Sequence, residues 1–182
     1  NPPDRRSPRS AVKCFASFLD SEANAFILQL LRRSLHQYAG RVTIAFATST
    51  AFRTFDEDLP LIQAAADQRG LDARILSWDD PDADWSTFDA VVIRSCWDYI
   101  ERRDEFLEWA RSVPRLHNSR EVIEWNTDKV YLRQLEAAGI PIIETRWDIA
   151  AGDDIGSPGE WVVKPTVSAG SKDTARWHAA ED

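Results

Sequence analysis

The chain has 182 residues, of which 43% are hydrophobic and 29% are charged, and its formal net charge is −8. This composition is ordinary for a globular protein with a buried core, and the length allows one or two domains. The acidic balance argues against a broad nucleic-acid surface, although a single nucleotide needs only a local positive pocket. No apolar run approaches the roughly 20 residues of a membrane-spanning helix, so we expect no membrane partner.

The two cysteines, Cys14 and Cys96, are far apart, and the three histidines form no cluster with them. This pattern is neither a disulfide framework nor a set of zinc ligands, so the sequence predicts a cytoplasmic protein without a zinc site. Methionine is absent, even at position 1. We therefore expect the chain to be a piece of a longer reading frame.

Residues 1–40 differ from the remainder, because they carry six Lys/Arg against three acids and none of the eight tryptophans. The Pro-, Arg- and Ser-rich stretch 1–10 is typical of disorder. Residues 21–38 place apolar side chains at helical spacing, which predicts an amphipathic helix. A signal peptide fits poorly, because charges interrupt the apolar stretch. We expect a poorly ordered extension with one helix, and a docking helix is the alternative.

From residue 41 onward, short apolar runs alternate with amphipathic helical patterns. The runs cover 42–47, 73–76 and 90–93, and the helical patterns cover 55–69 and 104–111. Strands that alternate with helices predict βαβ units and an open parallel sheet. We therefore expect an α/β domain over residues 41–118, in which ligands bind beyond the carboxyl ends of the strands.

Two loops follow strands of this predicted sheet. The first, residues 48–54, lacks Gly-x-Gly-x-x-Gly, so a dinucleotide site loses its main support. The second, residues 94–99, holds a guanidinium, hydroxyl groups, a carboxylate and an indole. We predict that it faces a substrate, through Arg94, Ser95, Trp97 and Asp98. The alternative is a turn held by its own side chains, in which Arg94 pairs with a loop aspartate instead of a substrate carboxylate. No histidine lies near Cys96 in sequence, which disfavours a nucleophilic thiol.

The segment 160–171 combines a short strand, a lysine and a loop of small residues. The strand pattern Trp161-Val-Val ends at Lys164, and Pro165 cannot donate to a sheet ladder. Small side chains from Thr166 to Ser171 leave backbone N–H groups and hydroxyls free to approach an anion. We predict that Lys164 clamps a phosphate. The alternative is a surface lysine before an ordinary turn.

A second lysine, Lys129, lies near the start of a predicted helix over residues 128–138. A cation is unfavourable in a first helical turn unless an anion lies nearby. An anionic ligand would explain it. The alternative is that Asp128 and solvent screen the charge at small cost.

Four motifs together resemble the ATP-grasp superfamily, in particular its glutathione synthetase-like and ribosomal-protein glutamate ligase-like branch. They are Asn126-Thr-Asp-Lys129, Gly139-Ile-Pro141, Val162-Val-Lys-Pro165 and Ser168-Ala-Gly-Ser171. The segment Val92 to Tyr99 resembles the substrate-domain segment of that branch. The resemblance covers residues 41–177. It implies an open parallel-sheet pre-ATP-grasp domain over 41–118, followed by the truncated start of an ATP-grasp α+β nucleotide-binding domain over 119–182.

The resemblance also implies a function. Lys129 and Lys164 would be the nucleotide lysines, and Ser168, Gly170 and Ser171 would belong to the loop over the phosphates. Enzymes of this superfamily use ATP and Mg²⁺ to phosphorylate a carboxylate, and an amine then attacks the acyl phosphate. The substrates would be small carboxylates and amines that are amino-acid- or peptide-like. Dimers are common in the superfamily, so a homodimer is compatible with the resemblance.

The family's magnesium ligands, which end in an acid-x-Asn pattern, are missing from this sequence. Asp173, Glu181 and Asp182 do not match that pattern. We therefore assign no catalytic or metal-binding residue, and we expect those ligands in a later part of the protein and little activity from this fragment alone. The alternative function is a non-catalytic nucleotide-binding or regulatory α/β module.

Overall fold

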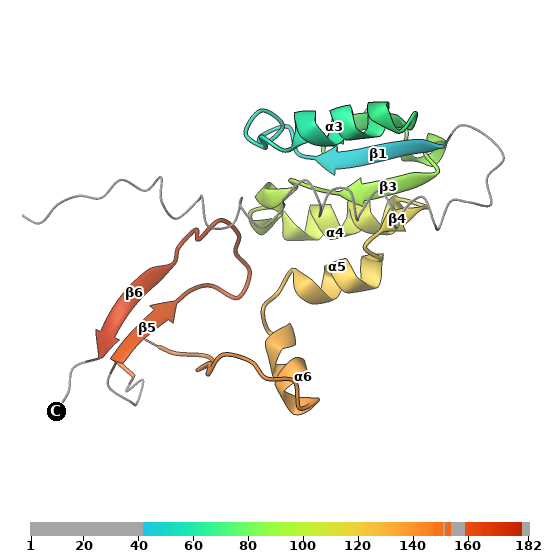
Figure 1. The fold of residues 1–182 in the computed structure, drawn as a ribbon. Helices are drawn as coiled ribbons and strands as arrows, with labels where there is room; N and C mark the ends of the chain where they lie inside the picture. The colour runs from blue at the N-terminus through green and yellow to red at the C-terminus, as the bar shows by residue number, and fades with distance from the viewer. Residues whose placement is uncertain (1–41, 151, 154–158, 180–182) are drawn as a thin grey trace, which may run out of the picture. The chain divides into compact units, whose positions relative to one another are not determined.

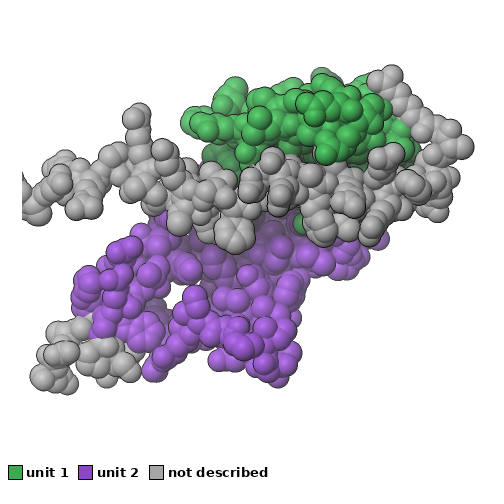
Figure 2. Space-filling model, in the orientation of Figure 1, with its two compact units in different colours: residues 1–98, 111–118 green, residues 99–110, 119–182 purple. Residues whose placement is uncertain are grey.

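The computed structural model describes residues 42–150, 152–153 and 159–179. The predicted extension over residues 1–40, with its helix at 21–38, lies outside the described residues. The chain divides into two compact units, which are coloured separately in Figure 2. Of the described residues, one unit holds 42–98 and 111–118, and the other holds 99–110 and those that follow residue 118.

The first unit is built on a four-stranded parallel sheet with the strand order β2-β1-β3-β4, of which β1, β3 and β4 are labelled in Figure 1. The strands are β1 (Thr43–Thr48), β2 (Asp72–Ser77), β3 (Ala90–Ile93) and β4 (Leu116–His117). Because β1 pairs with β2 on one side and β3 on the other, the strand order reverses between β1 and β3. In open α/β sheets, ligands bind at such a reversal, beyond the carboxyl ends of the strands. The predicted open parallel sheet is confirmed.

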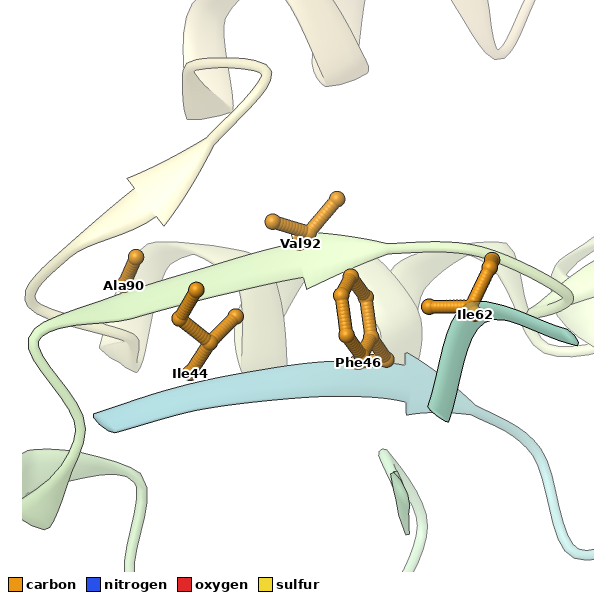
Figure 3. Close-up of a cluster of buried hydrophobic side chains, with 5 residues drawn as sticks. All are labelled: Ile44, Phe46, Ile62, Ala90 and Val92. Atoms are coloured by element: carbon orange, nitrogen blue, oxygen red, sulfur yellow. The ribbon is translucent and has the colours of Figure 1, made fainter. Parts of the chain in front are cut away.

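The core of this unit lies between the sheet and the helix α3 (Leu59–Gln68). Ile44 and Phe46 alternate along β1, and the register places them beside Ala90 and Val92 of β3. Figure 3 shows these four side chains gathered along the two strands, with Ile62 of α3 next to Phe46. All five side chains are buried, so this cluster fixes which face of the sheet the helix covers.

The other face of β1 and β3 is buried as well. Ala45, Ala47 and Val91 point to that face and are fully inaccessible to solvent. Strands that are buried on both faces read as continuous apolar runs instead of an alternating pattern. This explains why the sequence alone located β1 and β3 to within one residue at each end.

Strand β4 has only two residues, and its position depends on the neighbouring arginine. The guanidinium of Arg115 donates from Nε to the carbonyl of Phe88 and from Nη2 to the carbonyl of Ser86, both at 2.5 Å. The amide of Val91 donates to the carbonyl of Arg115 at 2.9 Å. These three bonds attach the residue before β4 to β3 and to the chain that precedes β3.

The second unit contains helices and a β-hairpin (Figure 1). Its elements are α4 (Arg103–Ser112, whose last two residues count with the first unit), α5 (Arg120–Asn126), α6 (Tyr131–Ala137), β5 (Gly159–Val163) and β6 (Ala175–Ala179). The strands β5 and β6 pair antiparallel, with Trp161 opposite Trp177. The sequence predicted β5 but not β6, because Arg176 and His178 interrupt any apolar run.

Both short helices have clear end signals. The hydroxyl of Ser119 accepts a hydrogen bond from the amide of Val122 and caps α5. Gly139, with φ of +76°, ends α6 in a Schellman arrangement, in which the amide of Ile140 donates to the carbonyl of Leu135 at 3.0 Å.

The start of α6 differs from the prediction, because the helix begins at Tyr131 instead of Asp128. The carboxylate of Asp128 accepts a bond from the amide of Val130, which forms a turn before the helix. The amide of Lys129 donates to Thr166, outside the helix. Lys129 therefore lies just before α6 and not within its first turn.

Candidate functional site

The loop between β5 and β6, residues 164–174, carries most of the predicted nucleotide residues. Lys164 follows β5 directly, and its side chain is exposed. Gly170 and Ser171 both have positive φ, at +59° and +61°. Ser171 is thus a non-glycine residue in the left-handed region, a conformation that is uncommon outside tight turns and functional loops.

Lys129 is bound to this loop by its side chain and by its backbone. Its ammonium nitrogen Nζ donates to the carbonyl of Thr166 at 3.1 Å and to both the carbonyl and the hydroxyl of Ser168 at 2.8 Å. Its amide donates to the same carbonyl of Thr166 at 2.9 Å. An ammonium group has three donor hydrogens, so these three acceptors use all of them.

The electrostatics of the two predicted lysines are linked. Partial burial lowers the pKa of Lys129, and the positive charge of Lys164 lowers it further, while Asp128 opposes the shift. The two ammonium groups are close enough for the charge of one to affect the pKa of the other, and they form a local positive region in an otherwise acidic chain. Such a region is what an anionic ligand requires.

The second lysine of the loop, Lys172, forms an ion pair with Glu101. The hydrogen bond to Glu101 raises the pKa of Lys172, and the negative charge of Glu101 adds to the effect. Both side chains are largely exposed, and exposed pairs of this kind contribute little to stability. Lys172 is thus occupied by a carboxylate, whereas Lys164 forms no hydrogen bond or ion pair with the described part of the chain.

The predicted substrate residues of the first unit lie at the carboxyl ends of β1 and β3. Arg94 follows β3, and its amide donates to the carbonyl of Ala47 at 2.8 Å. Its guanidinium Nη2 lies 3.2 Å from the carboxylate of Asp58 and 3.7 Å from that of Asp56. The side chains of Arg94 and Asp56 are only 10% and 5% exposed. The arginine therefore attaches the loop that follows β1 to the end of β3.

Ser95 and Cys96 are both buried at this edge. The hydroxyl of Ser95 lies 2.7 Å from the hydroxyl of Thr48, and neither residue is exposed. The thiol of Cys96 donates to the carbonyl of Ala47 at 3.4 Å. Burial raises the pKa of Cys96, and the nearby carboxylate of Asp98 raises it further. A thiol with a raised pKa is a poor nucleophile.

Trp97 and Asp98 differ in exposure. Trp97 is 44% exposed, and its ring meets that of Phe52 edge-on with centroids 5.5 Å apart. Asp98 is buried and accepts a hydrogen bond from the indole nitrogen of Trp78 at 3.0 Å. Of the four predicted substrate residues, Trp97 therefore presents the largest accessible surface.

The structure gathers Lys129, Lys164 and Ser168 at one loop of the second unit, and Arg94 to Asp98 at one edge of the first unit. It does not test their predicted roles, which remain predictions. The sequence did not predict Asp56 and Asp58 as partners of Arg94. Acidic residues are also common near the start of a helix, which was a sufficient explanation for both. No sequence pattern indicates contact between residues 36 positions apart, such as Asp58 and Arg94.

Neither a cluster of metal ligands nor a membrane-spanning helix is found in the described residues. Residues 42–150, 152–153 and 159–179 contain no group of three or more His, Cys, Asp or Glu that could hold a metal ion. No helix in the same residues is long and apolar enough to cross a membrane.

The fold is an open α/β domain followed by a region of helices and a hairpin, and its first part matches a known family. Residues 44–118 match the family described as the N-terminal domain of D-cycloserine synthetase DcsG. The cycloserine biosynthesis protein DcsG of Streptomyces lavendulae is 35% identical over 147 residues, which cover 74% of this chain and 49% of the relative.

A solved structure is similar as well. The crystal structure of D-cycloserine synthetase DcsG matches with a TM-score of 0.66 and 35% sequence identity, over 75% of this chain and 50% of that chain. The chain is therefore homologous to DcsG over the matched region. It spans about half the length of the curated relative.

Proposed function

We propose that the chain is the amino-terminal part of an ATP-grasp ligase, which joins a small carboxylate and an amine through an acyl phosphate. The observation that carries this proposal is the meeting of Lys129 and Ser168, 39 positions apart, beside Lys164. The homology to a protein named as a synthetase supports a biosynthetic, ligase-like function.

Phosphoryl transfer depends mainly on positioning and on neutralising charge. The exposed ammonium of Lys164 would contact the phosphates of ATP, and the loop 166–171 would cover them. A covering loop also keeps water from an acyl phosphate, which would otherwise hydrolyse. Mg²⁺ would accompany ATP and neutralise part of the phosphate charge, but the described residues offer no group of metal ligands.

In the first unit, Trp97 is the best candidate for substrate contact. The charge of Arg94 is already balanced by Asp56 and Asp58, so binding a substrate carboxylate would require the arginine to leave a partly buried ion pair. We therefore propose that Arg94 holds the edge of the sheet in place, while the exposed face of Trp97 packs against an amino-acid- or peptide-like substrate.

We also propose a cytoplasmic protein, which in complete form is a homodimer.

Calorimetry with ATP on the 182-residue chain tests the nucleotide site. Lys164→Ala should remove most of the ATP binding, because it deletes an exposed cation that has no hydrogen-bond or ion-pair partner among the described residues. Lys172→Ala is the matched control from the same loop, and it should bind ATP as the unmodified chain does, since Glu101 already neutralises that lysine. Full ATP binding by Lys164→Ala would refute the role of Lys164.

Turnover distinguishes a ligase from the alternative, a non-catalytic nucleotide-binding module. The complete gene product, given ATP with a carboxylate and an amine, should release ADP and phosphate together with an amide product. ATP binding without such release across amino-acid substrates would favour the non-catalytic module. Absence of ATP binding would refute both functions.

A further inference from the structure

Three aromatic rings form a cluster at the carboxyl edge of the sheet in the first unit. The ring of Phe52 meets those of Trp97 and Phe55 edge-on, with centroids 5.5 Å and 6.2 Å away and interplanar angles of 73° and 61°. Phe52 and Phe55 belong to the loop that follows β1, and Trp97 belongs to the segment that follows β3. Phe52 therefore joins the two segments that flank the reversal of strand order, where open α/β sheets bind ligands.

The two outer rings of this cluster present surface to a ligand. Phe55 is 73% exposed and Trp97 is 44% exposed, whereas Phe52 between them is half-buried. An edge-on contact covers at most one face of a ring, so Phe52 leaves at least one face of Trp97 and one of Phe55 uncovered. No described cation lies over these rings, in contrast to three rings elsewhere that arginines cover. Those three rings are Phe88, Trp147 and Trp161.

The chain around the cluster is strongly acidic. Residues 49–58, 78–84 and 94–98, which follow β1, β2 and β3, contain eight Asp/Glu and two Arg, a formal charge of −6. Asp79 joins two of these segments, because its carboxylate accepts from the amide and the hydroxyl of Thr50, both at 3.0 Å. Negative potential at this edge attracts cations, and an aromatic face attracts them as well. Ring surface and charge therefore favour the same kind of ligand group.

We propose that Trp97 and Phe55 bind the ammonium group of an amino-acid-like substrate over their ring faces, and that Phe52 is the positioning residue for both rings. This inference rests on the proposed ligase function, and it names the charged group of the substrate that this edge recognises. A substrate carboxylate would meet net negative charge here, because the guanidinium of Arg94 is already paired with two carboxylates.

The test uses tetramethylammonium, a cation that donates no hydrogen bond, and tert-butanol, a neutral molecule of similar shape. Each is titrated into the 182-residue chain while NMR follows the indole N–H of Trp97. Tetramethylammonium should shift this signal in a saturable way, and tert-butanol should not. Trp177 on β6 is the matched control, because it is 59% exposed but follows Arg176 and lacks the acidic surroundings. Its indole N–H should show no saturable shift.

Variants of the two phenylalanines separate contact from positioning. Phe55→Leu keeps an apolar side chain but removes a ring face, so tetramethylammonium should bind about two- to fivefold more weakly, the effect of one exposed cation–π contact. Phe52→Leu should weaken binding by a similar factor. Phe52→Tyr should restore it, because tyrosine keeps the ring that meets Trp97 edge-on. A loss in Phe52→Tyr as large as that in Phe52→Leu would overturn the positioning role of Phe52.

Three results would overturn the cation site. One is an equal response of Trp97 to tert-butanol, which would show a surface that is only apolar. Another is an equal response of Trp177 to tetramethylammonium. The third is saturable binding of acetate at Trp97 that excludes tetramethylammonium, which would indicate a carboxylate site. Calorimetry with ATP on the same chain distinguishes the failures. ATP binding without a response at Trp97 refutes the cation site alone, whereas the absence of both refutes the proposed function too.

Discussion

The hydroxyl groups of Thr48 and Ser95 lie 2.7 Å apart at the ends of β1 and β3, and both residues are fully buried. The Thr48 hydroxyl is also 3.4 Å from the carbonyl of Ser95. Two hydroxyls that satisfy each other out of contact with water join the two strands at the point where the strand order reverses. This pair explains the burial of Ser95 without a substrate.

Replacing Ser95 should therefore reduce stability. Ser95→Ala removes the partner of a buried hydroxyl, and we expect the free energy of unfolding to fall by about 1–2 kcal/mol in urea denaturation. Thr54→Ala, an exposed hydroxyl in the loop after β1, is the control and should change it by less than about 0.5 kcal/mol. Unchanged stability in Ser95→Ala would mean that the hydroxyl pair is not structural, and would strengthen a substrate role for Ser95.

Arg94 should be still more important for stability. Arg94→Gln leaves the carboxylate of Asp56, 5% exposed, without its cation, and we expect a loss of about 3 kcal/mol. Arg53→Gln is the control from the same loop, because the Arg53 side chain is exposed. The double variant Arg94→Gln with Asp56→Asn should recover part of the loss. Additive losses in the double variant would show that the two side chains are not energetically coupled.

These results indicate which parts of the fold the sequence could predict. Strands β1 and β3 were found because two buried faces leave a continuous apolar run, as in Ala90–Ile93. Strand β4 carried no such signal, since its two residues are only half-buried and it is positioned by the backbone and by Arg115. Backbone hydrogen bonds depend little on residue type, so a strand that is held mainly by them cannot be recognised from the sequence pattern.

The same reasoning applies to the candidate site. The resemblance singled out Lys129 and Lys164, but sequence could not predict that Lys129 would use its three donors on Thr166 and Ser168, 37 and 39 residues away. The contacts of Arg94 were missed for the same reason, because they depend on which strands are neighbours. A motif indicates the kind of chemistry, whereas hydrogen bonds between distant residues arise only in the folded chain.

Cys96 should be unreactive in the folded protein. Because burial raises its pKa, little thiolate forms at neutral pH. In a Cys14→Ser background, which leaves Cys96 as the single thiol, we expect a disulfide reagent to label the native chain very slowly and the urea-unfolded chain at once. The unfolded sample is the control for reagent quality. Rapid labelling of the native chain would contradict the burial of Cys96 and would support a role for its thiol as a nucleophile.

Asp89 should make stability depend on pH. Its carboxylate accepts hydrogen bonds from the amide and the hydroxyl of Thr43, both at 2.9 Å, and these bonds lower its pKa, the amide contributing most. The pKa of the folded state then lies below the unfolded value of about 3.9. The stabilisation is therefore fully present above that value and is lost as the pH falls through the folded pKa.

The replacement Asp89→Asn keeps an acceptor but cannot ionise, so it isolates this effect. At neutral pH we expect it to reduce the free energy of unfolding by about 1 kcal/mol, and the difference from the unmodified chain should shrink as the pH is lowered below about 4. Asp82→Asn is the control, because that side chain is exposed and forms no hydrogen bond with the described residues. The difference in the free energy of unfolding between Asp89→Asn and the unmodified chain could instead stay constant down to the pH of acid unfolding. In that case the charge on Asp89 does not strengthen its hydrogen bonds to Thr43. The link between β1 and the residue before β3 would then depend on hydrogen-bond geometry alone.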